Sequence, residues 1–253
     1  MLQTRVIPCL QLRGESLVKT IQFNKFGYIG DPVNTVKIFN DLYVDELAFI
    51  DITATVEKRE PNYKILHEIA DECFMPLSYG GGIDSLQKAE NVITIGFEKM
   101  ILNSAPFYNL CVITEIAKIY GSQAVVIAVD VKKNFWGKYE VYSNSGKTNQ
   151  KKDPKEWVKM VEDAGAGEIL LTSIDREGTW KGFDNILIKQ VAEATQLPVI
   201  ANGGANSIEN ISSAVKDAGA SAVALGSMVV YQAKDLGVLV NFPDREKLEN
   251  AIR

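Results

Sequence analysis

Short apolar runs alternate with longer amphipathic stretches along most of the chain. The apolar runs end in turn residues, and the amphipathic stretches begin at helix-capping signals such as Ser207, Asp31-Pro32 and Asp153-Pro154. Strand, turn and helix in this repeated order predict parallel βαβ units. We expect eight strands, at residues 6–10, 47–52, 76–79, 99–102, 124–130, 168–172, 198–201 and 222–225. Helices are expected at residues 31–42, 62–73, from 84 or 85 onward, 107–120, 153–164, 185–194, from 207 onward and 244–252.

Landmarks of the first half of the chain recur in the second half at one spacing. The Asp-Pro pairs at 31 and 153, the glutamates at 46 and 168, and the Gly-Gly pairs at 81 and 203 are each 122 residues apart. Two fused (βα)4 halves close into one ring, whereas an open sheet gives no reason for such symmetry. The sequence therefore predicts an α/β fold, a single (β/α)8 TIM barrel built from two pseudo-symmetric (βα)4 halves, as one domain over residues 1–253.

Two connections are longer than ordinary βα loops. Segment 12–31 follows the first strand and contains a short alternating stretch at 17–20. A polar insert follows residue 130, and its residues 138–143 are expected to form one arm of a hairpin. Long loops in compact domains are usually functional, so both connections are candidates for covering a site.

Composition excludes several classes of function. Hydrophobic residues make up 46% of the chain and charged residues 23%, which is typical of a soluble globular protein. With a net charge of −5 and no cluster of basic residues, we expect no nucleic-acid partner, and no apolar run is long enough to predict a membrane span. Three scattered cysteines favour a reducing cytoplasm. The single histidine, His67, argues against a metal centre and against Ser-His or Cys-His pairs, and no cofactor is expected.

Glycine-rich turns follow strands of both halves at equivalent positions. Such turns let backbone N–H groups converge on an anion, and the loops after the last two strands of a TIM barrel do this for phosphate. The alternative is that the glycines only make tight turns. The sequence predicts two phosphate sites on opposite sides of the barrel mouth. Their candidate residues are Gly82, Asn103 and Ser104 on one side, and Gly203, Gly204, Gly226 and Ser227 on the other.

Asp130 ends a strongly apolar strand, which places a carboxyl group at the mouth beside an apolar wall. Partial desolvation there would raise its pKa and make it a usable general acid or base, although a solvated loop-capping aspartate is the alternative interpretation. The position that corresponds to Asp130 in the first half is Gln11. A carboxamide neither gives nor takes a proton in the physiological pH range, so the pair contains at most one catalytic carboxylate.

Four charged residues stand at the starts of strands and point inward by strand parity: Arg5, Glu46, Lys99 and Glu168. Two positive and two negative groups in that setting would form a salt-bridged ring across the barrel floor, because buried charges persist only when paired. The ring is either a stabilising plug or a gate. Above it the expected inward positions are small for a barrel core, namely Cys9, Ala48, Ser78, Ala128 and Thr172.

These residues resemble those of the cyclase subunit of imidazole glycerol phosphate synthase, the HisF family. The matching runs extend along nearly the whole chain and include VDELAFIDITATVEKRE, GGGI, GSQAVVIAVD, AGAGEILLTSIDREGT and IANGGA. The resemblance implies a (β/α)8 barrel whose N-terminal face binds a HisH-like glutaminase, with ammonia entering through a floor gate of Arg5, Glu46, Lys99 and Glu168. It implies phosphate sites at Gly82, Asn103 and Ser104, and at Glu177, Gly178, Gly204, Gly226 and Ser227. Lys19, in loop 12–30, is a further candidate site residue.

The chain departs from the family at one member of the catalytic pair. The family's first strand typically ends in CLD, whereas CLQLRGE stands here, so that Asp130 is kept and Gln11 replaces the other aspartate. The runs LVKTIQFNKFGYIGDPVNTVKIFND and ECFMPLSYGGGI are similar to HisF-like proteins of bacterial surface-glycan gene clusters (the WbuZ type). That similarity implies ammonia delivery for converting an N-acetyl sugar to an acetamidino sugar, together with a separate sugar amidotransferase and a phosphorylated or nucleotide-linked ligand. The alternatives are the cyclase of histidine biosynthesis and a non-catalytic scaffold that activates a glutaminase.

Overall fold

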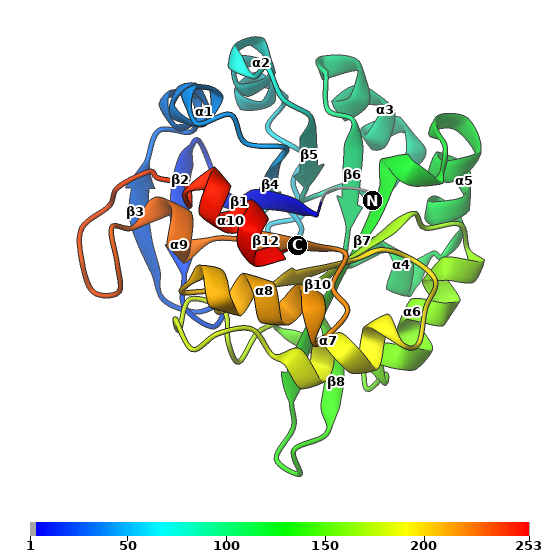
Figure 1. Cartoon of the computed structure of the whole chain (residues 1–253). Helices are drawn as coiled ribbons and strands as arrows, with labels where there is room; N and C mark the ends of the chain where they lie inside the picture. Colours follow the sequence, from blue (N-terminus) through cyan, green and yellow to red (C-terminus); the bar gives the residue numbers. More distant parts are fainter. Residues whose placement is uncertain (1–3, 253) are drawn as a thin grey trace.

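Eight parallel strands close into a barrel in the computed structural model, which describes residues 4–252. Around the barrel the strands are β1 (Arg5–Arg13), β4 (Leu47–Asp51), β5 (Leu77–Gly80), β6 (Lys99–Leu102), β7 (Val125–Lys133), β10 (Glu168–Ser173), β11 (Val199–Asn202) and β12 (Ala222–Leu225). The ring closes where β12 pairs with β1, with Arg5 opposite Ala222. The predicted (β/α)8 barrel is confirmed (Figure 1).

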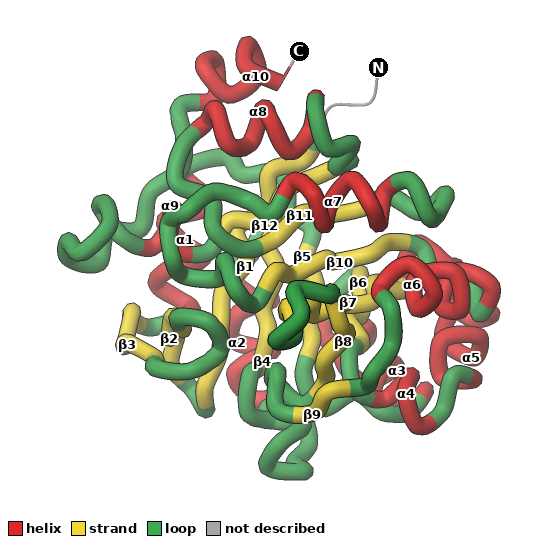
Figure 2. The backbone as a smooth tube through the Cα atoms, turned by 90° about the horizontal axis from the view of Figure 1, so that it is seen from below, coloured by secondary structure: helices red, strands yellow, loops and turns green. Residues whose placement is uncertain are grey.

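Helices surround these strands, as the two views show (Figures 1 and 2). They are α1 (Pro32–Asp41), α2 (Tyr63–Glu72), α3 (Leu86–Ile95), α4 (Ala105–Tyr108), α5 (Cys111–Tyr120), α6 (Pro154–Asp163), α7 (Asn185–Ala192), α8 (Ile208–Lys216), α9 (Ser227–Val230) and α10 (Arg245–Ile252). A 3-10 turn covers Ser122–Ala124. Equivalent caps begin equivalent helices, since Asp31 and Asp153 cap α1 and α6 and Ser85 and Ser207 cap α3 and α8. Within residues 4–252, no helix has the length and apolarity needed to cross a bilayer.

One expected helix is interrupted. The single helix predicted at 107–120 is divided into α4 and α5, because Asn109 adopts an extended backbone at φ −144° and ψ 98°. The Asn109 side chain accepts a hydrogen bond from the N–H group of Cys111, the first residue of α5, at 3.1 Å. Asparagine competes in this way with the helical hydrogen bonds, and here it restarts the helix.

Two barrel strands run past their expected ends and turn back as antiparallel sheet. β1 continues beyond Gln11 and pairs with β2 (Ser16–Thr20), which pairs with β3 (Phe26–Gly30) at one side of the barrel (Figure 2). β7 continues beyond Asp130 and pairs with β8 (Tyr139–Ser143), which confirms the predicted hairpin arm, and β8 pairs with the short β9 (Thr148–Asn149). The expectation that the first strand ended at Gln11 was wrong, because Leu12 and Leu17 continue the burial of the strand pair.

Apolar side chains form two cores, one between strands and helices and one inside the barrel. The inner core includes small residues that the sequence placed there, such as Cys9, Ala48 and Ala128. It also includes Leu170, which strand parity placed on the face of Glu168, and larger residues that the sequence analysis did not name: Ile7, Ile101, Val126 and Ile200. The barrel interior is therefore more filled than the small residues alone predicted.

Candidate functional site

Four charged side chains meet in a closed ring at the end of the barrel where the parallel strands begin. Arg5 Nη1 lies 2.7 Å from Glu46 Oε2, and Arg5 Nη2 lies 2.6 Å from Glu168 Oε1. Lys99 Nζ lies 3.0 Å from Glu46 Oε2 and 3.2 Å from Glu168 Oε2. Each cation therefore contacts both carboxylates. The structure brings together all four residues that the sequence singled out, while their role as a gate stays a prediction.

Each positive group of the ring lies against both negative groups. The Glu46 side chain is only 5% exposed, so its carboxylate depends on Arg5 and Lys99 for the solvation that water would otherwise supply. Burial alone would lower the pKa of Arg5, but the charges of Glu168 and Glu46 and their hydrogen bonds raise it. Removing one member would leave a buried charge without a partner, which typically costs about 3–5 kcal/mol.

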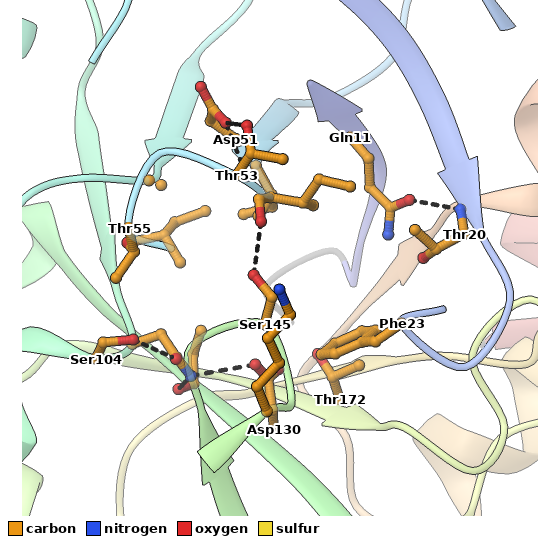
Figure 3. Close-up of a pocket in the computed structure, with 18 of the residues that line it drawn as sticks. Gln11, Thr20, Phe23, Asp51, Thr53, Thr55, Ser104, Asp130, Ser145 and Thr172 are labelled. Atoms are coloured by element: carbon orange, nitrogen blue, oxygen red, sulfur yellow. Dashed lines mark hydrogen bonds between the residues drawn. The ribbon is translucent and has the colours of Figure 1, made fainter. Parts of the chain in front are cut away.

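A cavity of about 1180 Å³ opens at the other end of the barrel, where the parallel strands end. Polar groups from several strands face this space (Figure 3). They include Gln11, Asp51, Thr53, Thr55, Asn103, Ser104, Asp130, Ser145 and Thr172. Cys9, Ile101, Ala128 and Leu170 line the deeper part, so the cavity extends into the inner core of the barrel. Chemistry in TIM barrels is found at this end.

Asp130 is a buried titratable group of this mouth. Its Oδ2 accepts a hydrogen bond from Asn103 Nδ2 at 3.1 Å. Burial raises the pKa of Asp130 to about 7, against a lowering effect of the Thr172 hydrogen bond and with a further increase from the charge of Glu177. Near neutral pH the carboxyl group is therefore present in both protonation states, which suits a general acid or base.

Gln11 is bound to the hairpin that covers one side of the mouth. Its amide oxygen accepts a hydrogen bond from the Thr20 N–H group at 2.8 Å (Figure 3), and its amide nitrogen donates to Glu177 Oε1 at 3.4 Å. The side chain thus holds β2 in place, and a carboxamide at this position has no proton to transfer. Of the predicted pair of Gln11 and Asp130, only Asp130 therefore carries a carboxyl group.

The two candidate phosphate sites differ in the space beside them. Gly82, Asn103 and Ser104 border the large cavity. Ser104 Oγ already accepts a hydrogen bond from the Asn144 N–H group at 3.0 Å. The opposite set, Gly178, Gly203, Gly204, Gly226 and Ser227, surrounds a separate space of about 30 Å³ together with Lys19 and Glu177. Binding of phosphate at either place stays a prediction.

Sequence reasoning missed an ion pair at the end of β4. Asp51 is 5% exposed, and both of its carboxylate oxygens lie 2.7 Å from Arg59 Nη2. Its Oδ1 also accepts hydrogen bonds from the N–H groups of Thr53 and Ala54, each at 3.0 Å, which orders the loop that borders Gly82. The signal was present in the sequence, because Asp51 follows an apolar strand just as Asp130 does.

Metal chemistry receives no support from the arrangement of ligands. Across residues 4–252, no three His, Cys, Asp or Glu side chains gather as a metal ion would require.

A parallel barrel with a polar mouth at its carboxyl ends and a charged ring at its base defines a TIM-barrel protein of the enzyme type. Residues 5–235 match the family model described as "Histidine biosynthesis protein", and the chain belongs to this family, among the HisF-like subunits of the imidazole glycerol phosphate synthase family.

Similar proteins from several bacteria cover nearly the same length. The chain is 46% identical over 249 residues to a protein of Pseudomonas aeruginosa provisionally named imidazole glycerol phosphate synthase subunit hisF2, covering 98% of this chain and 99% of that one. It is 40% identical over 253 residues to the provisionally named subunit hisF3 of Vibrio vulnificus, covering 100% and 97%. It is 40% identical over 211 residues to the imidazole glycerol phosphate synthase subunit HisF of Chloroherpeton thalassium, covering 83% and 84%.

The raised pKa of Asp130 makes folding stability depend on pH. In the native state the carboxyl group keeps its proton up to a pKa of about 7, whereas the unfolded chain releases it near 3.8. Between these two pKa values the native state binds more protons than the unfolded chain. The contribution of Asp130 to the free energy of unfolding therefore falls as the pH rises from about 4 to about 7. We expect the Asp130→Asn variant to lack this fall in the free energy of unfolding with pH. Urea unfolding at pH 5 and pH 8 measures it. Asp71→Asn, on the exposed face of α2, should keep the wild-type dependence, and an unchanged profile in Asp130→Asn would contradict the assignment.

Proposed function

We propose that the chain is the synthase-side subunit of a glutamine-dependent complex. Ammonia released by a HisH-like glutaminase enters at the base, passes the ring of Arg5, Glu46, Lys99 and Glu168, and reaches the mouth. There it serves the conversion of an N-acetyl sugar to an acetamidino sugar, with a separate sugar amidotransferase, in surface-polysaccharide biosynthesis. The observation that carries the proposal is a complete ring at the base combined with Gln11 in place of one catalytic aspartate.

Lys99 is the member of the ring best suited to open it. Arg5 contacts the two glutamates through a planar fork, with Nη1 2.7 Å from Glu46 and Nη2 2.6 Å from Glu168, and Nη1 also donates to Glu168 at 3.4 Å. Lys99 uses a single ammonium group at 3.0 and 3.2 Å, on a flexible stem with few constraints on its direction. Ammonia is neutral and needs no counter-ion, so a brief displacement of Lys99 is enough for its passage, while Arg5 keeps both carboxylates compensated.

Exposed aromatic residues near the ring supply a docking surface for the glutaminase. Tyr43 precedes β4 and is 78% exposed, and Phe74 precedes β5 and is 86% exposed. Asn40 links their loops, since it donates to the Glu72 carbonyl at 2.7 Å and accepts from the Phe74 N–H group at 3.2 Å. Ordered loops that display large aromatic side chains are typical of binding hot spots.

The cyclase of histidine biosynthesis is the second candidate. It is supported by the names of the relatives, which are imidazole glycerol phosphate synthase subunits, and by the buried Asp130 with a pKa of about 7. Against it stands Gln11, because proton transfer by one positioned side chain contributes about 10²–10⁴-fold to a rate.

Opening or blocking the base should separate glutamine-driven from ammonium-driven synthesis. With the purified glutaminase, we expect Ala48→Trp to block the passage, because Ala48 lies in the inner core just above the ring, and Lys99→Ala to remove the group that closes the ring, so that ammonia is no longer retained. Both variants should form less product per glutamate released from glutamine, while synthesis from ammonium salts continues. Glutamate release and final product are measured together. Lys64→Ala, on the exposed face of α2, is the control. If Lys99→Ala and Ala48→Trp both leave product formation from glutamine untouched, the chain acts as a non-catalytic scaffold that activates the glutaminase.

The histidine-pathway ribonucleotide distinguishes the two enzymatic candidates. With ammonium salts, we expect the wild-type chain to turn it over slower than an ordinary cyclase by about 10²–10⁴-fold. Gln11→Asp should raise this rate, because it restores a carboxyl group at the mouth. Steady-state product absorbance is the measurement. Wild-type turnover at ordinary enzyme rates would establish the cyclase and overturn the amidation proposal.

The surface formed by Tyr43 and Phe74 predicts which variants bind the glutaminase more weakly. Tyr43→Ser and Phe74→Ser should each weaken glutaminase binding by about 2 kcal/mol, a loss typical of truncated hot-spot aromatics. Titration calorimetry with the purified glutaminase measures the change. Tyr108→Ser is a matched control, because Tyr108 is 75% exposed but borders the mouth cavity at the opposite end. Equal binding by Tyr43→Ser, Phe74→Ser and Tyr108→Ser would place the glutaminase elsewhere.

A further inference from the structure

The glycine-lined space on the second-half side of the mouth contains a lysine from the other half of the chain. Lys19, on β2, is 6% exposed, and its side chain lies against Gly226: a Cβ atom at Gly226 would come within 2.8 Å of Lys19 Cε. Its ammonium group forms an ion pair with Glu177 and donates to the Thr20 carbonyl at 3.0 Å. A cation therefore already lies where the glycine turns converge.

Glu177 occupies the position of the anion in this arrangement. It is 3% exposed, and its Oε1 accepts hydrogen bonds from Thr20 Oγ1 at 3.0 Å and from Gln11 Nε2 at 3.4 Å, besides the contact with Lys19. Its Oε2 accepts from the Phe23 N–H group at 3.2 Å. Both oxygens are thus engaged by the β2–β3 hairpin. A buried carboxylate with these donors repels a second anion.

The remaining space is too small for a phosphate. About 30 Å³ is left among Lys19, Glu177 and the glycine turns, which is room for about one or two water molecules. The mouth cavity, by contrast, measures about 1180 Å³ and borders Gly81, Gly82, Asn103 and Ser104 directly.

Close backbone packing holds the pair in place. The Gln22 N–H group donates to the Glu177 carbonyl at 2.9 Å. A Cβ atom at Gly178 would overlap the Thr20 carbonyl oxygen and come within 2.9 Å of Ile21 Cα, so the hairpin lies directly on the loop that carries Glu177. Displacing the ion pair requires the hairpin to leave this loop.

We propose that the buried Lys19–Glu177 ion pair closes the second-half anion site, so that the mouth takes a ligand with a single anionic end. That end, a phosphate or a diphosphate, lies at the Gly81–Gly82 and Asn103–Ser104 side, and the uncharged remainder of the ligand extends through the cavity toward Asp130. Lys19 and Glu177 thereby determine specificity against ligands with phosphates at both ends. This inference rests on the part of the proposed function that makes the mouth the ligand site, and it is independent of ammonia passage.

Phosphate stoichiometry tests the proposal on the full chain without glutaminase. Inorganic phosphate, then pyrophosphate, is titrated by equilibrium dialysis and ³¹P NMR. We expect one phosphate per wild-type chain, and none when Asn103→Asp places a carboxylate at the open site. Glu177→Gln keeps the size of the side chain but breaks the ion pair with Lys19, so that the β2–β3 hairpin can leave the loop that carries residue 177 and the space beside the glycine turns can open. A second phosphate should then bind, with an affinity at least about tenfold above any residual binding there in the wild type.

Glu15→Gln is the matched control, since Glu15 is an exposed carboxylate in the β1–β2 turn of the same hairpin, and its stoichiometry should stay at one. Two phosphates on the wild-type chain, or none, would overturn the proposal, and these two results need no variant to fold. A folded Glu177→Gln variant that still binds one phosphate would overturn the role of the ion pair. None of these results depends on the glutaminase, so they test the phosphate site and leave the proposed ammonia passage to the experiments with glutamine.

Discussion

Four charges share the base of the barrel because none of them could be buried alone. Arg5 and Lys99 each contact both Glu46 and Glu168, so that positive and negative groups balance within one closed ring. Above the ring lies an apolar core that includes Ile101, and above that the polar mouth. Such a base excludes ions, for which the apolar layer is costly, but it offers no comparable barrier to a small neutral molecule. The proposed passage of ammonia depends on this order of layers.

The mouth is asymmetric although the chain repeats itself. The first strand of each half continues into an antiparallel extension, and each extension crosses to the other half. β2 brings Lys19 to Glu177, while the turn after β8 brings Ser145 Oγ within 2.6 Å of the Ile52 carbonyl. The first contact fills a glycine-lined space, whereas the second leaves a large cavity beside Gly82. Equivalent halves therefore present one closed and one open side to a ligand.

Sequence patterns predicted features that depend on local order. Alternation along each strand was enough to place Arg5, Glu46, Lys99 and Glu168 on one inward level, and capping residues such as Asp31 located the helix starts. The pairing of Lys19 with Glu177 was not foreseen, because it joins residues 158 positions apart and depends on how the hairpin folds back. The inner core holds larger side chains than expected, because strand parity was followed for the small residues but not for Ile7 and Ile200.

Gln11 and Glu177 are joined by a hydrogen bond. The glutamine at position 11 therefore has a structural role besides the loss of a catalytic carboxyl group. The Gln11 amide accepts from the Thr20 N–H group and donates to Glu177. A carboxylate at position 11 could still accept from Thr20, but it has no hydrogen to donate to Glu177. An amide at position 11 thus satisfies both Thr20 and Glu177 at once. The mouth thus combines one carboxyl group suited to proton transfer, Asp130, with a β2–β3 hairpin that Gln11 holds in place through Thr20.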